Sequence, residues 1–277
     1  MNNLPIGVFD SGVGGLTAVK ELRKILPKEE IIYFGDTGRV PYGTRSKDTI
    51  KKYAAQAIKY LASIGVKAIV VACGTVSSNF LQEDYDKLGL DIPYIRVVQP
   101  AAAEAVAASR SDTIGVLATK ASIDSGAYTE QIHRYNSSKL VESSAASVLI
   151  PMVESGIIDK SQPMVQAALD YYLKDIKALK ADSIILGCTH FPLLAPAIEE
   201  YLGYPVTLID SGAAAARQLK TLLEETGQLT SDNNGKESYY VTDSKEGFVS
   251  VAKIFLSEDI SKDVHYVDLE TIDVGKD

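Results

Sequence analysis

The chain of 277 residues has no tryptophan, only three histidines and only two cysteines, Cys73 and Cys188. Two cysteines this far apart do not make a CxxC metal motif, and in a reducing compartment they are not expected to form a structural disulfide. Lysine and arginine number 28 against 36 aspartate and glutamate residues, so the formal net charge is −8. This acidic balance argues against a nucleic-acid partner, because such partners select basic surfaces.

Long apolar segments are also missing. No apolar run approaches the roughly 20 residues that span a bilayer. The first residues, MNNLP, lack the basic start and the apolar stretch of a secretory signal. We therefore expect a cytoplasmic protein with no membrane contact, and an acidic ligand would have to be bound by local backbone amides rather than by the field of the whole protein.

Short apolar runs alternate with helical patterns, which predicts an α/β fold with mainly parallel sheets. Buried strands are predicted at Ile6–Phe9, Glu30–Phe34, Ala68–Ala72, Tyr94–Val98, Thr113–Ala118, Ser183–Leu186 and Val206–Ile209. Helices are predicted at Thr17–Leu26, Lys47–Ser63, Val165–Leu179 and Ser211–Glu225. The predicted loop Ser231–Glu237 is followed by a strand at Ser238–Thr242, a helix at Glu246–Leu256 and a strand at Val264–Leu269.

The chain contains a weak internal repeat. The string IGVFDS from Ile6 resembles IGVLAT from Ile114, and IVVACGT from Ile69 resembles IILGCT from Ile184. Each half therefore has an early Ile-Gly-Val strand and a later strand that ends in cysteine with threonine close behind. The repeat predicts that the two cysteines occupy equivalent strand ends.

Two related halves suggest two pseudo-symmetric, doubly wound domains. We expect residues 1–97 with 211–277 to form the first and residues 98–210 the second, because the last predicted strands are expected to return to the first domain. The active site is then expected in the cleft between the domains, with both thiols facing it.

Small residues follow the first predicted strand in the segment DSGVGG, Asp10–Gly15. Amides in such a turn at a helix N-terminus bind anions. One interpretation is a dinucleotide site, with Asp36 as the ribose-binding acid, but G-x-G-x-x-G requires a glycine at the position of Thr17. Two other interpretations of the segment stay open. It is either a plain tight turn or a substrate-binding turn, with Asp10 as a functional acid at the end of a strand.

Two further segments are candidates by composition. The segment GDTGRVPYG, Gly35–Gly43, is dense in turn-forming residues. It is either a generic loop or a cover over a ligand that presents the amides of Tyr42 and Gly43. Glu154 lies among apolar residues in PMVESG and is either an acid tuned by its surroundings or a charge at a helix start.

Both cysteines lie at the ends of predicted strands. Cys73 leads toward a helix, and a helix N-terminus lowers the pKa of a thiol, although a free cysteine is more commonly buried and inert. Cys188 is followed by Thr189 and His190 in the segment GCTHFP. A cysteine, a threonine and a histidine together at a strand–helix junction favour a functional role.

These segments together resemble the glutamate racemases, a family of cofactor-independent amino-acid racemases. The matching pieces are FDSGVGGLT (Phe9–Thr17), GDTGRVPYG (Gly35–Gly43), the segment Ala72–Ser77 and ILGCTHFPLL (Ile185–Leu194). They occur in the family's order and cover nearly the full length. The resemblance implies glutamate as the substrate, no pyridoxal phosphate or other cofactor, no metal, D-glutamate supplied for peptidoglycan and often a homodimer.

The resemblance also implies roles for individual residues. Cys73 removes the α-proton from D-glutamate and Cys188 removes it from L-glutamate, each thiol protonating the face opposite the other. Asp10 assists near Cys73, and Glu154 and His190 assist near Cys188. The implied substrate-binding residues are Asp10, Ser11, Pro41, Tyr42, Gly43, Gly74, Thr75, Thr189 and His190.

The sequence departs from the family pattern at Gly74, where asparagine is usual. The loss of this side-chain amide removes a hydrogen-bond donor to the substrate carboxylate, and a hydrogen bond to a charged group contributes about 1.5–3 kcal/mol. Strict specificity for glutamate is therefore open at this point. The change to Gly38, where alanine is common, is expected to matter little.

Several alternatives stay open on the sequence alone. One is a racemase for aspartate or another acidic amino acid, and a close variant is a hydantoin- or maleate-type enzyme of the same superfamily. Another is a two-domain protein that binds an acidic ligand without catalysis. The third is a regulator that has lost activity.

Overall fold

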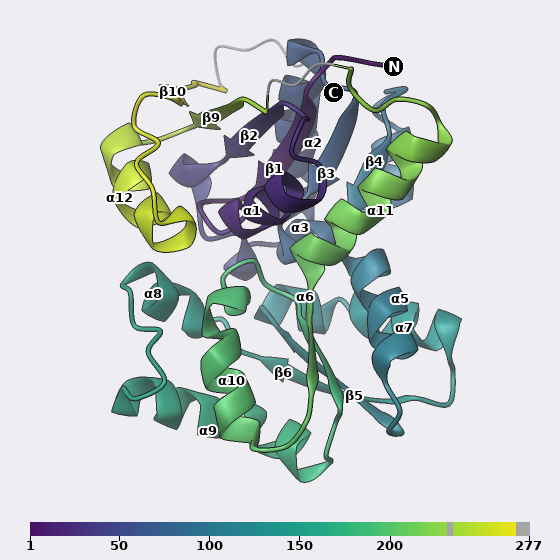
Figure 1. Cartoon of the computed structure of the whole chain (residues 1–277), viewed down its shortest axis with the longest axis vertical. Helices are drawn as coiled ribbons and strands as arrows, with labels where there is room; N and C mark the ends of the chain where they lie inside the picture. Colours follow the sequence, from purple (N-terminus) through teal and green to yellow (C-terminus); the bar gives the residue numbers. More distant parts are fainter. Residues whose placement is uncertain (232–234, 270–277) are drawn as a thin grey trace.

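The computed structural model describes residues 1–231 and 235–269, arranged as two lobes that each contain one parallel sheet (Figure 1). The six-stranded sheet of the first lobe has the order β10-β9-β2-β1-β3-β4. Its strands are β1 (Ile6–Asp10), β2 (Ile31–Gly35), β3 (Ala68–Val71), β4 (Tyr94–Arg96), β9 (Glu237–Val241) and β10 (Val264–Tyr266). The four-stranded sheet of the second lobe has the order β6-β5-β7-β8, with β5 (Thr113–Ala118), β6 (Leu140–Ala145), β7 (Ser183–Leu186) and β8 (Thr207–Asp210).

Helices surround both sheets, as crossover connections between parallel strands require. The α-helices are α1 (Leu16–Ile25), α2 (Lys47–Ile64), α3 (Gly74–Asn79), α4 (Gln82–Asp86), α5 (Val98–Ala108), α6 (Lys120–Asp124), α7 (Ala127–Tyr135), α8 (Leu149–Glu154), α9 (Pro163–Ala178), α10 (Ala195–Leu202), α11 (Ser211–Glu225) and α12 (Lys245–Leu256). Short 3-10 helices are η1 (Thr37–Arg39), η2 (Tyr42–Thr44) and η3 (Phe191–Leu194).

Local sequence explains where the longest helix, α2, begins and ends. Ser46 precedes it and accepts a hydrogen bond from the backbone N–H of Thr49 at 3.3 Å, which satisfies a free amide of the first turn. Gly65 follows it at φ 87°, a left-handed conformation that favours glycine. The helix buries one apolar face, which includes Ile50, Ile58 and Leu61, against the first sheet.

The internal repeat is confirmed by the topology. Strands β2-β1-β3-β4 of the first sheet correspond in order to β6-β5-β7-β8 of the second, and all these neighbours are parallel. The Ile-Gly-Val strings lie on the matched strands β1 and β5, and the cysteines follow the matched strands β3 and β7. The fold class is therefore as the sequence predicted, whereas the exact domain boundaries stay a prediction.

Some elements differ from the prediction. Strand β6 was missed because Leu140–Ala145 is an edge strand, half-buried or exposed along its length, without a continuous apolar run. Val98 begins α5 instead of ending β4, and β10 ends at Tyr266 rather than at Leu269. In the predicted loop Ser231–Glu237, residues 232–234 lie outside the described residues, and Glu237 already belongs to β9.

None of the helices in the described part of the chain combines the length and the apolar character needed to cross a lipid bilayer.

A buried ion pair supports the edge of the first lobe opposite the second. Lys67 Nζ lies 2.5 Å from Glu29 Oε2, and both side chains are almost fully shielded from solvent. The ammonium also donates to the carbonyl oxygens of Asn2 at 2.8 Å and Gln228 at 2.9 Å, and Glu29 Oε1 accepts from the N–H of Thr230. This network connects the N-terminal segment to the connection that follows α11.

The substitution Lys67→Met is expected to lower the free energy of unfolding by about 3–5 kcal/mol, because it leaves the Glu29 carboxylate buried without its charge partner. Denaturant unfolding measures the change. The double variant Lys67→Met/Glu29→Met is the matched control and is expected to lose less than the single variant, since no unpaired charge is left. An unchanged stability of the single variant would contradict the role of the pair.

Candidate active site

A cavity of about 380 Å³ lies between the carboxyl ends of the two sheets. Every site residue expected from the sequence lines it: Asp10, Ser11, Pro41, Tyr42, Gly43, Cys73, Gly74, Thr75, Glu154, Cys188, Thr189 and His190. They meet there because parallel strands deliver their carboxyl ends to one edge of each sheet, and the two edges face each other. The structure thus brings these residues together, and their roles stay predictions.

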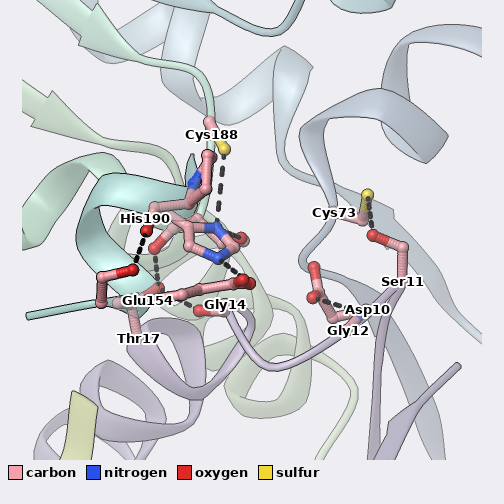
Figure 2. Close-up of polar contacts among 12 residues, drawn as sticks. Asp10, Ser11, Gly12, Gly14, Thr17, Cys73, Glu154, Cys188 and His190 are labelled. Atoms are coloured by element: carbon pink, nitrogen blue, oxygen red, sulfur yellow. Dashed lines mark hydrogen bonds and ion pairs between the residues drawn. The ribbon is translucent and has the colours of Figure 1, made fainter. Parts of the chain in front are cut away.

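Figure 2 shows the two cysteines on opposite sides of the cavity. Cys73 follows β3 and immediately precedes α3, and Cys188 follows β7 and precedes η3. Both side chains are buried, at 5% and 6% exposure, and both thiols are free. One thiol therefore comes from each lobe.

The surroundings of Cys73 favour its neutral form. Burial and the negative charge of Asp10 raise the pKa of the Cys73 thiol to about 12. The Ser11 hydroxyl lies 3.3 Å from the sulfur, within hydrogen-bond distance, and only partly offsets this rise. A thiol with this pKa is an acid rather than a base at neutral pH.

Asp10 is the last residue of β1 and lies below Cys73 in the cavity (Figure 2). Its Oδ2 accepts a hydrogen bond from the backbone N–H of Gly12 at 2.9 Å. Its Oδ1 is buried and has no hydrogen-bond partner among the described residues. Burial raises the pKa of the Asp10 carboxyl, and the Gly12 hydrogen bond lowers it by less. The free Oδ1 can exchange a proton with a group in the cavity.

Cys188 has a different set of neighbours. Its sulfur lies 3.8 Å from Nδ1 of His190, and Nε2 of the same ring lies 2.9 Å from Glu154 Oε1. Glu154 is the last residue of α8, with 40% of its side chain exposed. The contacts connect the second thiol to solvent through an imidazole and a carboxylate. The interpretation of Glu154 as a charge at a helix start is wrong, because the residue ends its helix.

His190 is held in its protonated form. Burial by itself lowers the pKa of the imidazole, but the hydrogen bonds to Cys188 and Glu154 outweigh it and raise the pKa to about 10. The folded protein therefore holds this proton more tightly than the unfolded chain, whose histidine pKa is about 6.5. The resulting stabilisation is complete below about pH 6.5 and is lost as the pH rises through about 10.

The loop Gly35–Gly43 follows β2 of the first lobe, and its last residues line the cavity. Both carboxylate oxygens of the buried Asp36 accept protein hydrogen bonds: Oδ2 from Arg39 at 2.7 Å and from the Tyr42 hydroxyl, and Oδ1 from Thr242 at 2.8 Å. Asp36 thus holds the loop in place, which argues against the ribose-binding interpretation. The Tyr42 hydroxyl is thus bound to Asp36, while Pro41, Tyr42 and Gly43 line the cavity.

The glycine-rich turn after β1 packs against the second lobe. A Cβ at Gly14 would lie 2.2 Å from Thr189 Oγ1 and 2.4 Å from His190 Cε1. Thr17, at the position where a dinucleotide motif needs glycine, donates from its hydroxyl to the Thr189 carbonyl at 2.9 Å. The turn requires small residues here because the loop that carries Cys188 lies directly on it.

The sequence analysis missed Thr119. This residue follows β5, lines the cavity, and its hydroxyl lies 2.9 Å from that of Thr75 in the other lobe. The repeat contained the signal, because Thr119 in IGVLAT stands where Ser11 stands in IGVFDS. Ser147 and Ile150 also line the cavity, and no local pattern singles them out.

Within residues 1–231 and 235–269, no group of three or more histidine, cysteine, aspartate or glutamate side chains could hold a metal ion.

Comparison with known proteins matches residues 15–219 to the family described as Asp/Glu/Hydantoin racemase. The chain belongs to this racemase family. A glutamate racemase of Neisseria meningitidis is 42% identical over 253 residues, which cover 91% of this chain and 92% of the relative. A glutamate racemase of Streptococcus thermophilus is 40% identical, with 98% of each chain covered.

Solved structures of the racemase family share the fold. The glutamate racemase of Francisella tularensis, crystallised with D-glutamate, superposes with a TM-score of 0.90 at 39% identity, covering 98% of this chain and 100% of that one. The glutamate racemase isoform RacE1 of Bacillus anthracis gives a TM-score of 0.90 at 35% identity, with 97% and 99% covered.

Gly74, where the family resemblance led us to expect asparagine, lies at a close contact between the lobes. A Cβ at Gly74 would lie 2.0 Å from the carbonyl oxygen of Gly187, the residue before Cys188. The backbones that carry the two thiols therefore touch at this point. Any side chain at position 74, asparagine included, would require one lobe to move relative to the other.

The substitution Gly74→Ala is expected to lower the free energy of unfolding by about 1–3 kcal/mol, the usual cost of forcing a methyl into a packed site. Denaturant unfolding measures it. Gly43→Ala is the matched control in the same cavity, since its Cβ would come no nearer than 3.6 Å to Thr119, and its effect is expected to stay within about 0.5 kcal/mol. Equal stabilities of the two variants would show that the Gly187 contact imposes no constraint.

The substitution Glu154→Gln is expected to lower the pKa of His190 from about 10, because it removes the anionic partner of Nε2. Titration of the imidazole followed by NMR measures the shift. Glu130→Gln, which removes an exposed partner of Arg134, is the control and should leave the His190 titration where it is. If both variants titrate like the wild type, Glu154 does not hold the proton on His190.

Proposed function

We propose that this chain is a glutamate racemase that inverts the α-carbon of its substrate with Cys73 and Cys188 as the acid–base pair. The observation that carries the proposal is that the only two cysteines of the chain line one cavity from opposite lobes. Inversion without a cofactor needs two proton-transfer groups on opposite faces of a planar carbanion, and the positions of the two thiols meet that requirement.

The unequal surroundings of the thiols suggest which acts first on each enantiomer. Cys73 is neutral, whereas the imidazolium of His190 places a positive charge next to the sulfur of Cys188. With L-glutamate, the Cys188 thiolate takes the α-proton, and the electron pair of the C–H bond remains on the carbanion. The Cys73 thiol then donates its proton to the opposite face and becomes the thiolate. This direction agrees with the roles that the family resemblance implies.

The thiols must regain their starting protonation states before the next turnover. The free Oδ1 of Asp10 is suited to return a proton to Cys73, since burial raises the pKa of this carboxyl. His190 and the half-exposed Glu154 are suited to carry the proton of Cys188 to solvent. Asp10, His190 and Glu154 therefore assist the two cysteines and do not replace them.

We infer that the substrate is held by hydroxyls and backbone N–H groups of Ser11, Tyr42–Gly43, Gly74–Thr75 and Thr189–His190, beside Pro41, which has no N–H to donate. All of these residues line the cavity. Among residues 1–231 and 235–269, no lysine or arginine lines it. The carboxylates of the substrate would thus be bound by dipoles, which is how an acidic protein can bind an acidic ligand. The similar proteins are glutamate racemases, which favours glutamate over aspartate as the substrate, and the D-glutamate produced is expected to supply peptidoglycan synthesis.

Racemisation can be tested by incubating the protein with L-glutamate, D-glutamate or L-aspartate in deuterated water without an added cofactor. We expect loss of optical rotation and incorporation of deuterium at the α-carbon with both enantiomers of glutamate. The variants Cys73→Ala and Cys188→Ala should each lower the rate by at least about 10²–10⁴-fold, because each removes one proton-transfer group.

The outcomes separate the alternatives. Turnover of aspartate but not glutamate would change the substrate and keep the mechanism. No exchange with any of the three amino acids would favour a protein that binds an acidic ligand without catalysis. Full activity of either cysteine variant would overturn the two-thiol mechanism.

A further inference from the structure

A larger cavity adjoins the one that contains the thiols. It has a volume of about 770 Å³ and shares the lining residues Gly43, Thr44 and Ser147 with the catalytic cavity. The start of α2 in the first lobe forms one wall, and α6 with the connection between β6 and α8 in the second lobe forms the other. We call this space the basic vestibule.

The charged residues of the basic vestibule are Arg45, Lys47, Lys120 and Asp124. Lys120 pairs with Asp124 at 2.7 Å, so these two charges largely cancel. Arg45 and Lys47 are exposed and form no ion pair with any residue in the part of the chain that the structure describes. Asp48 is exposed next to Lys47 in α2 but does not line the vestibule. The local formal charge is therefore positive on a protein whose net charge is −8.

A second, smaller cavity adjoins the catalytic cavity on another side. It has a volume of about 190 Å³ and shares Gly12, Val40 and Glu154 with it. Its charged residues are Glu154 and Asp243, both acidic. An anion that approached from this side would meet negative charge in a narrower space, so charge and size both favour the basic vestibule.

We propose that the basic vestibule is the entrance for the anionic substrate and that Arg45 and Lys47 attract its carboxylates toward the thiols. The proposal extends the proposed function, and it concerns the path into the site rather than the reaction. A cleft lined by one sign of charge raises the local concentration of the opposite ion and its rate of entry. Here the attraction must come from local groups, because the protein as a whole repels anions.

The two thiols report on this path directly, because the chain has no other cysteine. Iodoacetate and iodoacetamide alkylate a thiolate in the same way: the S–C bond forms, the C–I bond breaks, and iodide leaves. The first reagent is an anion and the second is neutral. The ratio of their rates, measured by mass spectrometry at Cys73 and Cys188, therefore isolates the charge of the entrance, since changes in thiol pKa or in the opening of the lobes affect both reagents alike.

The double variant Arg45→Glu/Lys47→Glu is expected to lower the ratio of iodoacetate to iodoacetamide rates about fivefold at low ionic strength. The difference should shrink toward the wild-type value as salt is added, because salt screens exposed charges. With L-glutamate as the substrate, the same variant should show a similar fold decrease in kcat/KM. The decrease should come from a higher KM, with kcat nearly unchanged.

Lys20→Glu/Lys28→Glu is the matched control. It makes the same change in net charge at two exposed lysines that line neither the catalytic cavity nor the vestibule. Its alkylation ratio should equal that of the wild type. The conservative variant Arg45→Lys/Lys47→Arg should also keep the wild-type ratio.

The alkylation test does not depend on turnover. If the wild type racemises glutamate but Arg45→Glu/Lys47→Glu and the control give the same alkylation ratio, the proposed entrance is wrong and the proposed function stands. If the ratio falls only in Arg45→Glu/Lys47→Glu but the wild type racemises nothing, the entrance for anions stands and the proposed function is wrong.

Discussion

The carbonyl oxygen of Gly187 lies where a side chain at residue 74 would begin, only 2.0 Å from the position of a Cβ. This contact limits how closely the two sheets approach each other, and the geometry of the cavity depends on it. Cys73 and Cys188 are the chain neighbours of the two touching residues, so the backbone that carries one thiol is fixed against the backbone that carries the other. A second close contact, between Gly14 and the Thr189–His190 segment, also limits how closely the two lobes approach each other. Two glycines thus permit the close contacts between the lobes on which the shape of the cavity depends.

The two lobes have matching strand orders, but their chemistry is not symmetric. Strands β3 and β7 deliver the thiols from equivalent positions. Cys73 meets a serine hydroxyl and a buried carboxylate, whereas Cys188 meets a protonated imidazole. Matching strand positions therefore place the two thiols in different electrostatic surroundings, because these depend on neighbouring side chains and burial rather than on the strand order.

Charge is also distributed unevenly around the cleft. In the described part of the chain, the residues that line the cavity include an aspartate, a glutamate and a histidine but no lysine or arginine, while the basic vestibule beside it carries Arg45 and Lys47. Strong cations next to the thiols would alter their protonation, and at a distance they attract an anion without doing so. Separating attraction from catalysis in this way suits a protein with a net charge of −8.

The sequence by itself determined the fold class, the parallel strands, the repeat and the set of polar residues at the strand ends. Each depends on local signals: apolar runs mark buried strands, small residues mark turns, and family motifs mark the site. Only the tertiary structure decided what depends on contacts across the lobes. It showed that Gly74 is required by the backbone of Gly187, that Thr119 faces Thr75, and that Glu154 at the end of α8 reaches His190. Edge strand β6 could not be predicted from the sequence, because a half-exposed strand has no continuous apolar run. The basic vestibule could not be predicted either, because surface charges have no period along the chain.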